Sequence, residues 1–532
     1  YVANKGSYCP RQALSREGTD TPRTAGASLS PNGAPFSMIS TSTSGTSPLV
    51  RHGGEVYLRS GCCGETTRPQ DTEELQNHLL TGNMIMGWSK LMQNRLGLVV
   101  ACGLGLFATR TAADWSRFRG PEGNSVVVGV KLPAEWAEDS HVAWKVRIPG
   151  RGWSQPVVAG NRIFVTTAIA ENEEEPRRSD GGVPRGARNA TKDDYQWKVM
   201  CLSASTGRVL WDDVAYEGKP AHRKHRGNTY ASETPVVDDE RVFVYFGAQG
   251  MICYDHSGKR QWEKKLGGFP TQAGWGTASS PVTYGDTVLI QCDNQRQSFL
   301  VALDKKTGGE LWRADRDEKT NWSTPYLWKN RAREELVVAG GTKMRSYAPA
   351  TGKLLWEMAG SGRTSVSPVG NEEMLFVDSV KSFQGSPGRF AAIRPGASGD
   401  ISLQAGETTN EFVAWSMILR SYRNSSPLLY RNCVYMLEQS RGIVRCFDAK
   451  TGKLNYQERL PGSSGFAASP WANDDKIFLL DDAGLTTVLA PGPQYKLIRS
   501  NRLSDGIVWS SPAVAGDRLL IRGREHLYCI RN

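Results

Sequence analysis

The sequence predicts an all-β fold, an eight-bladed β-propeller of four-stranded antiparallel blades. The first observation is a strand opening marked by proline, which recurs eight times with a spacing near 45 residues in most repeats. The second is a Ser/Thr-Gly turn followed closely by an aromatic residue, which recurs five times. The third is that no 3.6-residue periodicity runs through the repeats, which excludes a solenoid of helices. The prolines are Pro156, Pro235, Pro281, Pro325, Pro368, Pro427, Pro470 and Pro512.

One repeat, residues 424–456, shows how each unit is built. It holds three short apolar runs and then a short strand that ends in Tyr456. Runs of this length, rich in Val, Leu, Ile, Tyr and Phe and separated by turn residues, are typical of an antiparallel meander. In the last turn Asp448 can cap through its side chain, and Gly452 supplies the positive φ that the turn requires. The three runs are Leu428–Tyr430, Cys433–Leu437 and Gly442–Phe447.

The last repeat predicts how the ring closes. After Pro512 the chain has three strands and then stops, without the fourth strand and its aromatic residue. A strand with a tryptophan, His141–Ile148 with Trp144, stands before the first repeat. We therefore expect this N-terminal strand to complete the last blade, which also removes the exposed sheet edges.

The N-terminal part of the chain differs from the repeats. Residues 1–83 are rich in Ser, Thr, Gly and Pro and lack any periodicity, which predicts a disordered extension or an over-long translation start. Residues 84–113 combine Lys90 and Arg95 with an apolar run and small residues, as in a secretory signal peptide. The β-propeller domain is then expected over 114–532. Two alternatives stay open: a lipid on Cys102, and an uncleaved membrane anchor.

Composition narrows the classes of partner. A net charge of +11 over 532 residues is modest, and no dense Lys/Arg tract with interleaved aromatic residues occurs, so nucleic acid is not expected. No CxxC, HExxH or Asp-rich calcium loop occurs, so no metal site is predicted. Six cysteines fall in the repeats, four of them at an equivalent place, and we expect them to be small buried apolar residues. These four are Cys201, Cys253, Cys446 and Cys529.

The candidate site lies on the face where the chain enters the first strand of each blade. Trp153, Trp322 and Trp509 stand three residues before the proline in blades 1, 4 and 8. Three tryptophans at one repeat position near the axis can stack on a flat ligand or grip an extended peptide, and they can equally fill the central channel.

The loop that enters blade 2 is expected on the same face. Its cations could meet a carboxylate or a phosphate group. Its histidines are expected to titrate near neutral pH. The candidate ligand-binding residues of this loop are His222, His225, Arg226, Asn228, Tyr230 and Glu233, together with Arg223 and Lys224. Longer inserts are expected at residues 171–194 of blade 1 and near Lys381–Ala414 of blade 5.

Several segments resemble the pyrroloquinoline quinone (PQQ)-type propeller family. The turn-plus-aromatic segments match an A-x-D-x-x-T-G-x-x-x-W-like docking motif in at least four blades, and residues 114–124 and 222–247 resemble exported, planctomycete-type members. The resemblance covers about residues 114–532. The segments are Ser205–Trp211, His256–Trp262, Lys306–Trp312, Ala350–Trp356 and Lys450–Tyr456.

This resemblance implies one of two functions. Some members are quinoprotein dehydrogenases, which hold PQQ with Ca²⁺ over the axis, use acidic and Asn ligands and a catalytic Asp, and often carry a vicinal Cys disulfide. Others, such as the assembly lipoprotein of the outer-membrane β-barrel machinery, share the fold and bind no cofactor. The only Cys-Cys pair here is Cys62-Cys63, upstream of the expected cleavage near Ala113.

The sequence therefore favours a binding or scaffold module over an enzyme. We expect it to be exported, in the periplasm or at the cell surface, without a transmembrane segment after cleavage of the signal. A protein segment or a cell-surface polymer is the expected partner, and no cofactor is expected. The alternative is a PQQ-dependent dehydrogenase that oxidises alcohols or sugars. Fold alone does not decide between the two, because activity depends on the site.

Overall fold

The structure is a computed structural model, and it describes residues 115–172, 193–360, 362, 364–379, 388–419, 421, 423–506 and 508–532. The chain divides into two units, Tyr1–Leu91 and Met92–Asn532, and every described residue lies in the second. The expected N-terminal extension and signal peptide lie outside the described residues. Within the described part of the chain, no helix is both long and apolar enough for a membrane crossing.

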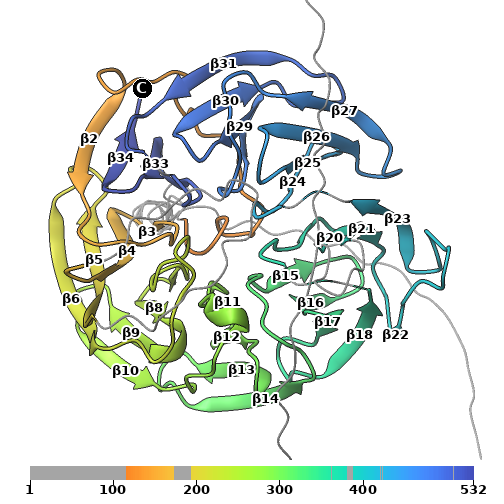
Figure 1. Cartoon of the computed structure of the whole chain (residues 1–532), viewed down its shortest axis with the longest axis horizontal. Coiled ribbons are helices and arrows are strands. Elements are labelled where there is room, and N and C mark those ends of the chain that lie inside the picture. Colours follow the sequence, from red (N-terminus) through yellow and green to blue (C-terminus); the bar gives the residue numbers. More distant parts are fainter. Residues whose placement is uncertain are drawn as a thin grey trace, which may run out of the picture. The chain divides into compact units, whose positions relative to one another are not determined.

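Eight antiparallel sheets stand around a central axis in sequence order (Figure 1), which confirms the eight-bladed propeller. From the axis outward, blade 1 contains β3 (Val157–Ala159), β4 (Arg162–Ile169), β5 (Tyr195–Ser203) and β6 (Val209–Gly218). Blade 2 contains β7 (Val236–Val237), β8 (Arg241–Tyr245), β9 (Met251–Asp255) and β10 (Arg260–Lys264). Blade 3 contains β11 (Val282–Tyr284), β12 (Thr287–Cys292), β13 (Ser298–Asp304) and β14 (Glu310–Arg316). Blade 4 contains β15 (Tyr326–Lys329), β16 (Glu334–Ala339), β17 (Lys343–Tyr347) and β18 (Leu354–Ala359).

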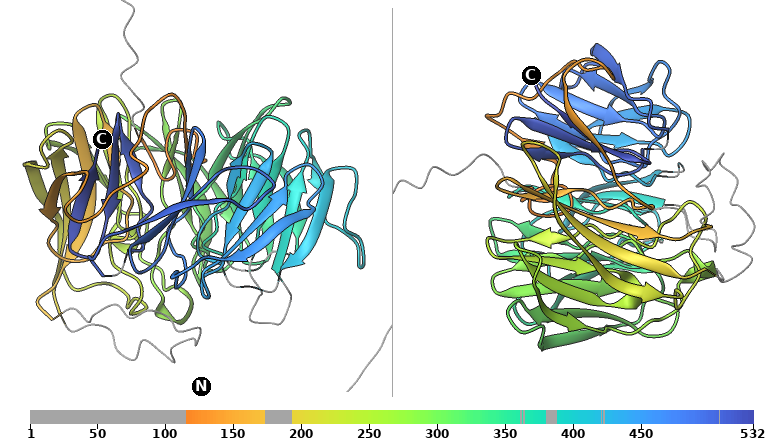
Figure 2. Two further views of the ribbon diagram at one scale, coloured as in Figure 1. Left: turned by 90° about the horizontal axis from the view of Figure 1, so that it is seen from above. Right: turned by 90° about the vertical axis from the view of Figure 1, so that its left-hand side faces the viewer.

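The second half of the ring repeats this plan, and the side views show its sheets edge-on, one beside the next (Figure 2). Blade 5 contains β19 (Val369–Gly370), β20 (Leu375–Asp378), β21 (Gly388–Ile393) and β23 (Val413–Leu419). Blade 6 contains β24 (Leu428–Tyr430), β25 (Cys433–Leu437), β26 (Ile443–Asp448) and β27 (Leu454–Arg459). Blade 7 contains β28 (Trp471–Asn473), β29 (Lys476–Leu480), β30 (Leu485–Leu489) and β31 (Leu497–Arg502). Blade 8 contains β32 (Ala513–Ala515), β33 (Arg518–Arg522), β34 (His526–Ile530) and β2 (Val142–Arg147).

The proline positions mark the blades as expected. Each innermost strand begins at the residue directly after one of the eight prolines. Proline suits this place because it has a fixed φ and donates no hydrogen bond to the sheet ladder. In blade 6 the Asp448 carboxylate accepts the Thr451 N–H at 2.8 Å, and Gly452 has φ +72°, so the turn has the predicted chemistry.

The ring closes through the N-terminal strand. Strand β2 pairs antiparallel with β34, and Trp144 stands in register with Cys529. The indole Nε1 of Trp144 donates to the carbonyl oxygen of Ala204 in blade 1 at 3.1 Å. The expected interlock of first and last blades is therefore confirmed.

Two short strands extend the blades beyond the repeat pattern. Strand β1 (Val126–Val127) pairs parallel with β28 in blade 7, and β22 (Gly399–Asp400) pairs parallel with β18 in blade 4. Strand β22 belongs to the insert expected near Lys381–Ala414, so part of that insert joins the neighbouring blade. Repeat spacing could not indicate either pairing, because each strand has only two residues and lies outside the repeated four-strand pattern.

Neighbouring blades are held together by a tryptophan that rests on a glycine. Trp211 of β6 lies so close to Gly258 of blade 2 that a Cβ atom there would stand 2.7 Å from the ring. Its Nε1 donates to the carbonyl oxygen of His256 at 3.0 Å. The same contact joins Trp144 to Gly207, Trp262 to Gly308, Trp312 to Gly352 and Trp415 to Gly452. The turn-plus-aromatic repeat is therefore a docking device between blades.

Equivalent cysteines occupy equivalent sites, as expected. Cys201, Cys253, Cys446 and Cys529 lie in the third strand of their blades, opposite the aromatic residue of the fourth. All four are buried, and the six cysteines of the described residues are free. Burial raises the pKa of the Cys201 thiol to about 12, so it behaves as a small apolar group.

A belt of hydrogen bonds surrounds the axis at the start of the innermost strands. In seven blades the residue before the proline is Ser or Thr, and its hydroxyl accepts the N–H of the equivalent residue in the preceding blade at 2.9–3.1 Å. In blade 1 this residue is Gln155. The hydroxyl groups are those of Thr234, Ser280, Thr324, Ser367, Ser426, Ser469 and Ser511.

The segment Trp115–Asn124, called here the axial segment, crosses the centre of the ring (orange in Figure 1). The carbonyl oxygen of Trp115 accepts the N–H of Val158 in blade 1. At the other side, the Arg119 guanidinium donates to the carbonyl oxygens of Pro368 and Pro427 at 3.1 and 2.5 Å. Arg119 is buried, and burial lowers its pKa to about 10. Blades 1, 5 and 6 are thus tied together across the axis.

Candidate functional site

The three expected tryptophans lie on the face where the chain enters the innermost strands, called here the entry face. Trp153, Trp322 and Trp509 are all partly exposed. The rings of Trp153 and Trp509, from adjacent blades 1 and 8, lie 5.1 Å apart between centroids and are tilted by 46°. Trp322 has a different partner, so the three do not form one cluster.

That partner is Trp275, which repeat-based reasoning missed. The two rings stack at 5.7 Å with an interplanar angle of 28°, and Trp322 Nε1 donates to the carbonyl oxygen of Gly276 at 2.8 Å. Trp275 lies in the loop before β11, six residues before Pro281, and so outside the repeat position. The sequence signal that could have indicated Trp275 is its place between two glycines, Gly274 and Gly276, in a loop that enters a strand.

The loop that enters blade 2 connects the two tryptophan pairs. Trp153 Nε1 donates to the carbonyl oxygen of Gly227 at 3.2 Å, and a Cβ atom on Gly227 would lie 3.0 Å from the Trp509 ring. Two residues earlier, the His225 ring stands edge-on to Trp275 at 5.8 Å. The result is one continuous surface, the aromatic arc, formed by Trp153, Trp509, Gly227, His225, Trp275 and Trp322.

Asn228 fixes this loop in place. Its Nδ2 donates to the carbonyl oxygens of Trp275 and Thr277 at 2.9 and 3.2 Å, and its Oδ1 accepts the Thr229 N–H and the Ser232 hydroxyl. All its polar atoms are therefore engaged within the protein, and Asn228 positions the arc without presenting a group to a ligand.

His222 and Tyr230 lie beside a second feature, a pocket between blades 1 and 2. The Tyr230 hydroxyl donates to the carbonyl oxygen of His222 at 2.9 Å, and His222 Nε2 lies 2.7 Å from the carbonyl oxygen of Gly268. The pocket holds about 420 Å³ of space, counted out to its open mouth. Its walls also include Trp197, Phe246, Phe269 and Thr271.

The basic loop has one electrostatic effect within the arc. The pKa of His225 is lowered, first by burial and then by the nearby charges of Arg226 and Lys224. His225 therefore binds a proton less readily than an ordinary histidine, and the expectation that it titrates near neutral pH stays a prediction. Neighbouring cations disfavour a further positive charge, and a repeat pattern does not reveal this crowding.

Glu233 does not reach the entry face. It is only 2% exposed, and a Cβ atom on Gly247 would lie 3.2 Å from its Oε1, which has no hydrogen-bond partner. Burial raises its pKa to about 7, opposed by a hydrogen bond to the Thr277 side chain. Glu233 is thus an internal carboxyl group beneath the loops.

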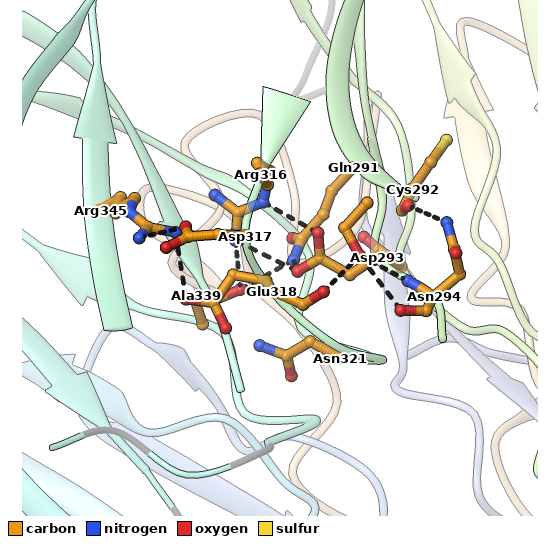
Figure 3. Close-up of polar contacts among 12 residues, drawn as sticks. Gln291, Cys292, Asp293, Asn294, Arg316, Asp317, Glu318, Asn321, Ala339 and Arg345 are labelled. Atoms are coloured by element: carbon orange, nitrogen blue, oxygen red, sulfur yellow. Dashed lines mark hydrogen bonds and ion pairs between the residues drawn. The ribbon is translucent and has the colours of Figure 1, made fainter. Parts of the chain in front are cut away.

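Other carboxylates near this end of the strands are paired with arginines. Arg316 Nε lies 2.8 Å from Asp293, and Arg345 lies 3.1 Å from Glu318, both in the cluster of Figure 3. In blade 5, Arg423 binds Asp378 at 2.5 Å, with both side chains buried. These pairs use the carboxylate oxygens within the protein.

The described residues do not fit PQQ with Ca²⁺. Among them, no group of three or more His, Cys, Asp or Glu side chains is placed to hold a metal ion. Calcium needs six to eight oxygen ligands, with carboxylates among them, whereas the buried carboxylates Asp293, Glu318 and Asp378 bind arginine. The Cys62-Cys63 pair lies outside the described residues. The expectation that no cofactor binds stays a prediction.

Comparison with known proteins gives the family. Residues 171–298 and 295–510 match the model of the family described as outer membrane protein assembly factor BamB. The chain belongs to this family. The expected kinship with PQQ-like propellers is thereby confirmed, while the narrower resemblance to planctomycete-type members stays a prediction.

Individual BamB-family relatives and solved propellers are distant. A europium-containing methanol dehydrogenase aligns with a TM-score of 0.51 at 11% identity, over 79% of this chain and 98% of that one. BamB from Moraxella catarrhalis gives a TM-score of 0.49 at 13% identity, over 74% and 97%. A tetrathionate hydrolase of Acidithiobacillus ferrooxidans is 19% identical over 61% of this chain. The chain spans about half of that relative, 53% of its length. At this identity the structural likeness shows the fold alone.

Proposed function

We propose that the protein is an exported binding module that holds an extended protein segment on the aromatic arc. The observation that carries this proposal is the joining of two tryptophan pairs, from four different loops, into one partly exposed surface. Tryptophans that present both an apolar ring and an N–H group are the commonest anchors of protein interfaces. The family description, an outer membrane assembly factor, supports a role in protein interaction.

The arc is held rigid before any ligand arrives. Trp153 and Trp322 each donate a hydrogen bond to a loop carbonyl, at 3.2 and 2.8 Å, and Asn228 ties the two loops together. A preformed surface loses little conformational entropy on binding, which favours affinity. This is the behaviour that a scaffold requires.

A peptide array tests the binding role. We expect a defined set of peptides about twelve residues long, long enough to cross several blades, to bind the purified propeller. In the triple variant with Trp153, Trp322 and Trp509 replaced by alanine, affinity should fall by about 1–4 kcal/mol per anchor. The matched control replaces Leu210, Leu311 and Ile418, exposed apolar residues of the outer strands, with alanine. Equal binding by both variants would contradict the proposal.

The dehydrogenase alternative is tested on the same preparation. The purified protein receives PQQ and Ca²⁺, and absorbance and dye-linked alcohol oxidation are followed. We expect no substrate-dependent reduction of the dye, because Asp293, Glu318 and Asp378 are paired with arginines. Stoichiometric PQQ binding with dye reduction would contradict the binding-module proposal and support the dehydrogenase alternative.

Export is tested by N-terminal sequencing of the protein from its native host. Lys90 and Arg95 precede an apolar run, and small residues end at Ala113, so the mature chain should begin at or near Asp114. A mature chain that starts upstream of Met84 would contradict export by this signal. Lipid attached at Cys102 would place the protein on a membrane surface.

A further inference from the structure

We propose that the segment bound by the aromatic arc is acidic, with carboxylate side chains that accept hydrogen bonds from the arc. This inference rests on the proposed function and names the chemistry of its ligand. It follows from polar atoms that the fold leaves without a partner, from the charge of the blade 2 loop, and from the way the tryptophan rings face one another.

The unpartnered atoms along the arc are donors. At one end, Trp509 Nε1 and Arg226 Nε are buried and make no hydrogen bond within the protein. Neither group can accept a hydrogen bond, so only an acceptor can satisfy it. A buried donor left unpaired destabilises the free protein, and an oxygen of a ligand would remove that cost.

Asn321 supplies a third such donor at the other end of the arc. It is 4% exposed, and its Oδ1 accepts the N–H groups of Trp322 and Thr364 at 2.9 and 3.0 Å. These two bonds fix which side-chain atom is oxygen, and they leave the Nδ2 group without a partner. Among the residues drawn in Figure 3, no dashed line joins Asn321 to the arginine–carboxylate cluster.

The charge of the loops that enter blades 2 and 3 matches an anionic ligand. Residues 222–226 read His-Arg-Lys-His-Arg, and the loop that carries Trp275, residues 265–280, contains no acidic residue. The nearest carboxyl group in the blade 2 loop, Glu233, is buried beneath it. Two neighbouring cations act on His225, which shows a local excess of positive charge. Such a surface attracts carboxylates and repels basic segments.

The ring geometry favours a peptide over an acidic sugar polymer. Stacking on a sugar needs a flat, open tryptophan face. Here Trp275 and Trp322 stack on each other, and Trp153 and Trp509 turn toward each other, so each pair covers part of its own faces. A sugar ring cannot stack on a face that is already covered, whereas an extended peptide can contact the partly exposed tryptophans through its side chains.

Matched peptides test this inference by fluorescence anisotropy. Three labelled twelve-residue probes share one leucine anchor and differ only in alternate positions, which hold Asp, Asn or Lys. We expect the Asp probe to bind at least about tenfold more tightly than the isosteric Asn probe, because charged acceptors form stronger hydrogen bonds. Raising the salt from about 50 to about 300 mM should reduce the difference. An oligogalacturonate of similar length provides the sugar comparison.

Variants locate the effect. Asn321→Asp keeps the Oδ1 acceptor and replaces the unpartnered N–H₂ with an oxygen, so the Asp probe should bind about tenfold more weakly while the Asn probe changes little. Asn371→Asp is the matched control, since Asn371 Oδ1 also accepts two backbone N–H groups, at 3.0 and 2.9 Å, in the turn between β19 and β20. A third variant, Trp509→Phe, removes the N–H donor together with the five-membered ring of the indole. It too should weaken binding of the Asp probe.

The outcomes separate this inference from the proposed function. If array peptides bind the arc without preference for Asp and Glu, the inference of an acidic ligand is wrong, while the proposed binding function is supported. If no peptide binds, both fail. Tighter binding of oligogalacturonate than of the Asp probe would also overturn the inference, and unchanged melting temperatures of the variants ensure that lost binding reflects the site.

Discussion

The side-chain Oε1 of Gln155 accepts a hydrogen bond from the backbone N–H of Arg119 at 2.7 Å. Gln155 stands where the other seven blades have a belt hydroxyl, and its longer side chain reaches the axial segment instead. Its Nε2 donates to the carbonyl oxygen of Pro512 in blade 8. One exception in the repeat therefore joins the axial segment to the first and last blades.

Replacing Gln155 with serine should place a hydroxyl at this position, as in the other seven blades, and lower the stability of the protein. The buried N–H of Arg119 would lose its acceptor, at a cost of about 1–3 kcal/mol in the free energy of unfolding. Urea denaturation measures the change. Thr234→Ser is the control, because it keeps the hydroxyl that accepts the Gln155 N–H at 3.0 Å. A Gln155→Ser protein as stable as the parent would show that the axial segment is held by other contacts.

Removing residues 141–148 should open the ring. Strand β34 would lose its outer partner and expose a row of backbone donors and acceptors. We expect aggregation or a broad, less cooperative melting transition, measured by light scattering and calorimetry. A chain that starts at Asp114 and keeps β2 is the control for shortening. If the melting curves of the two shortened chains coincide, the interlock does not stabilise the propeller.

Adding a methyl group at Gly258 should separate blades 1 and 2. Gly258 has φ +94°, and the new Cβ would stand 2.7 Å from the Trp211 ring. Gly360→Ala is the matched control, with φ +86° and no atom within 4 Å of the new Cβ. Both changes strain the backbone, so the difference between them isolates the contact and should be about 1–3 kcal/mol. Equal losses of stability would mean that the tryptophan moves aside freely.

Glu233 should make stability depend on pH. Its pKa is raised from 4.5 to about 7 by burial, so the folded protein keeps a proton that the unfolded chain releases between these values. Stability should therefore fall by about 3 kcal/mol as pH rises from about 4.5 to 7, and then level off. The Glu233→Gln variant should lack this loss. Denaturation at several pH values compares it with the parent and with Glu372→Gln, a change at an exposed turn.

The fold could be read from the sequence because every blade repeats the same local signals. Each proline marked the start of an innermost strand, and the unpaired strand around Trp144 revealed the closure. The axial segment carries no such repeat. Its bonds to Pro368 and Pro427 span 249 and 308 residues, and only the folded ring brings these partners together.

The candidate site was predictable only in part. The shared repeat position located Trp153, Trp322 and Trp509 on one face, but it could not show that they form two separate pairs. Trp275 lies outside that position, and Glu233 lies beneath the surface although its loop is exposed. Which neighbour a side chain meets across a blade boundary depends on loop conformation, and this has no period in the sequence.

The pairing of β2 with β34 also sets the order in which the protein can mature. Trp144 of β2 and Cys529 of β34, which stand in register, lie 385 positions apart. The ribosome must release almost the whole chain before this pair can form, so closure follows synthesis. Until then the chain displays two open sheet edges, which can pair with other chains unless they are protected.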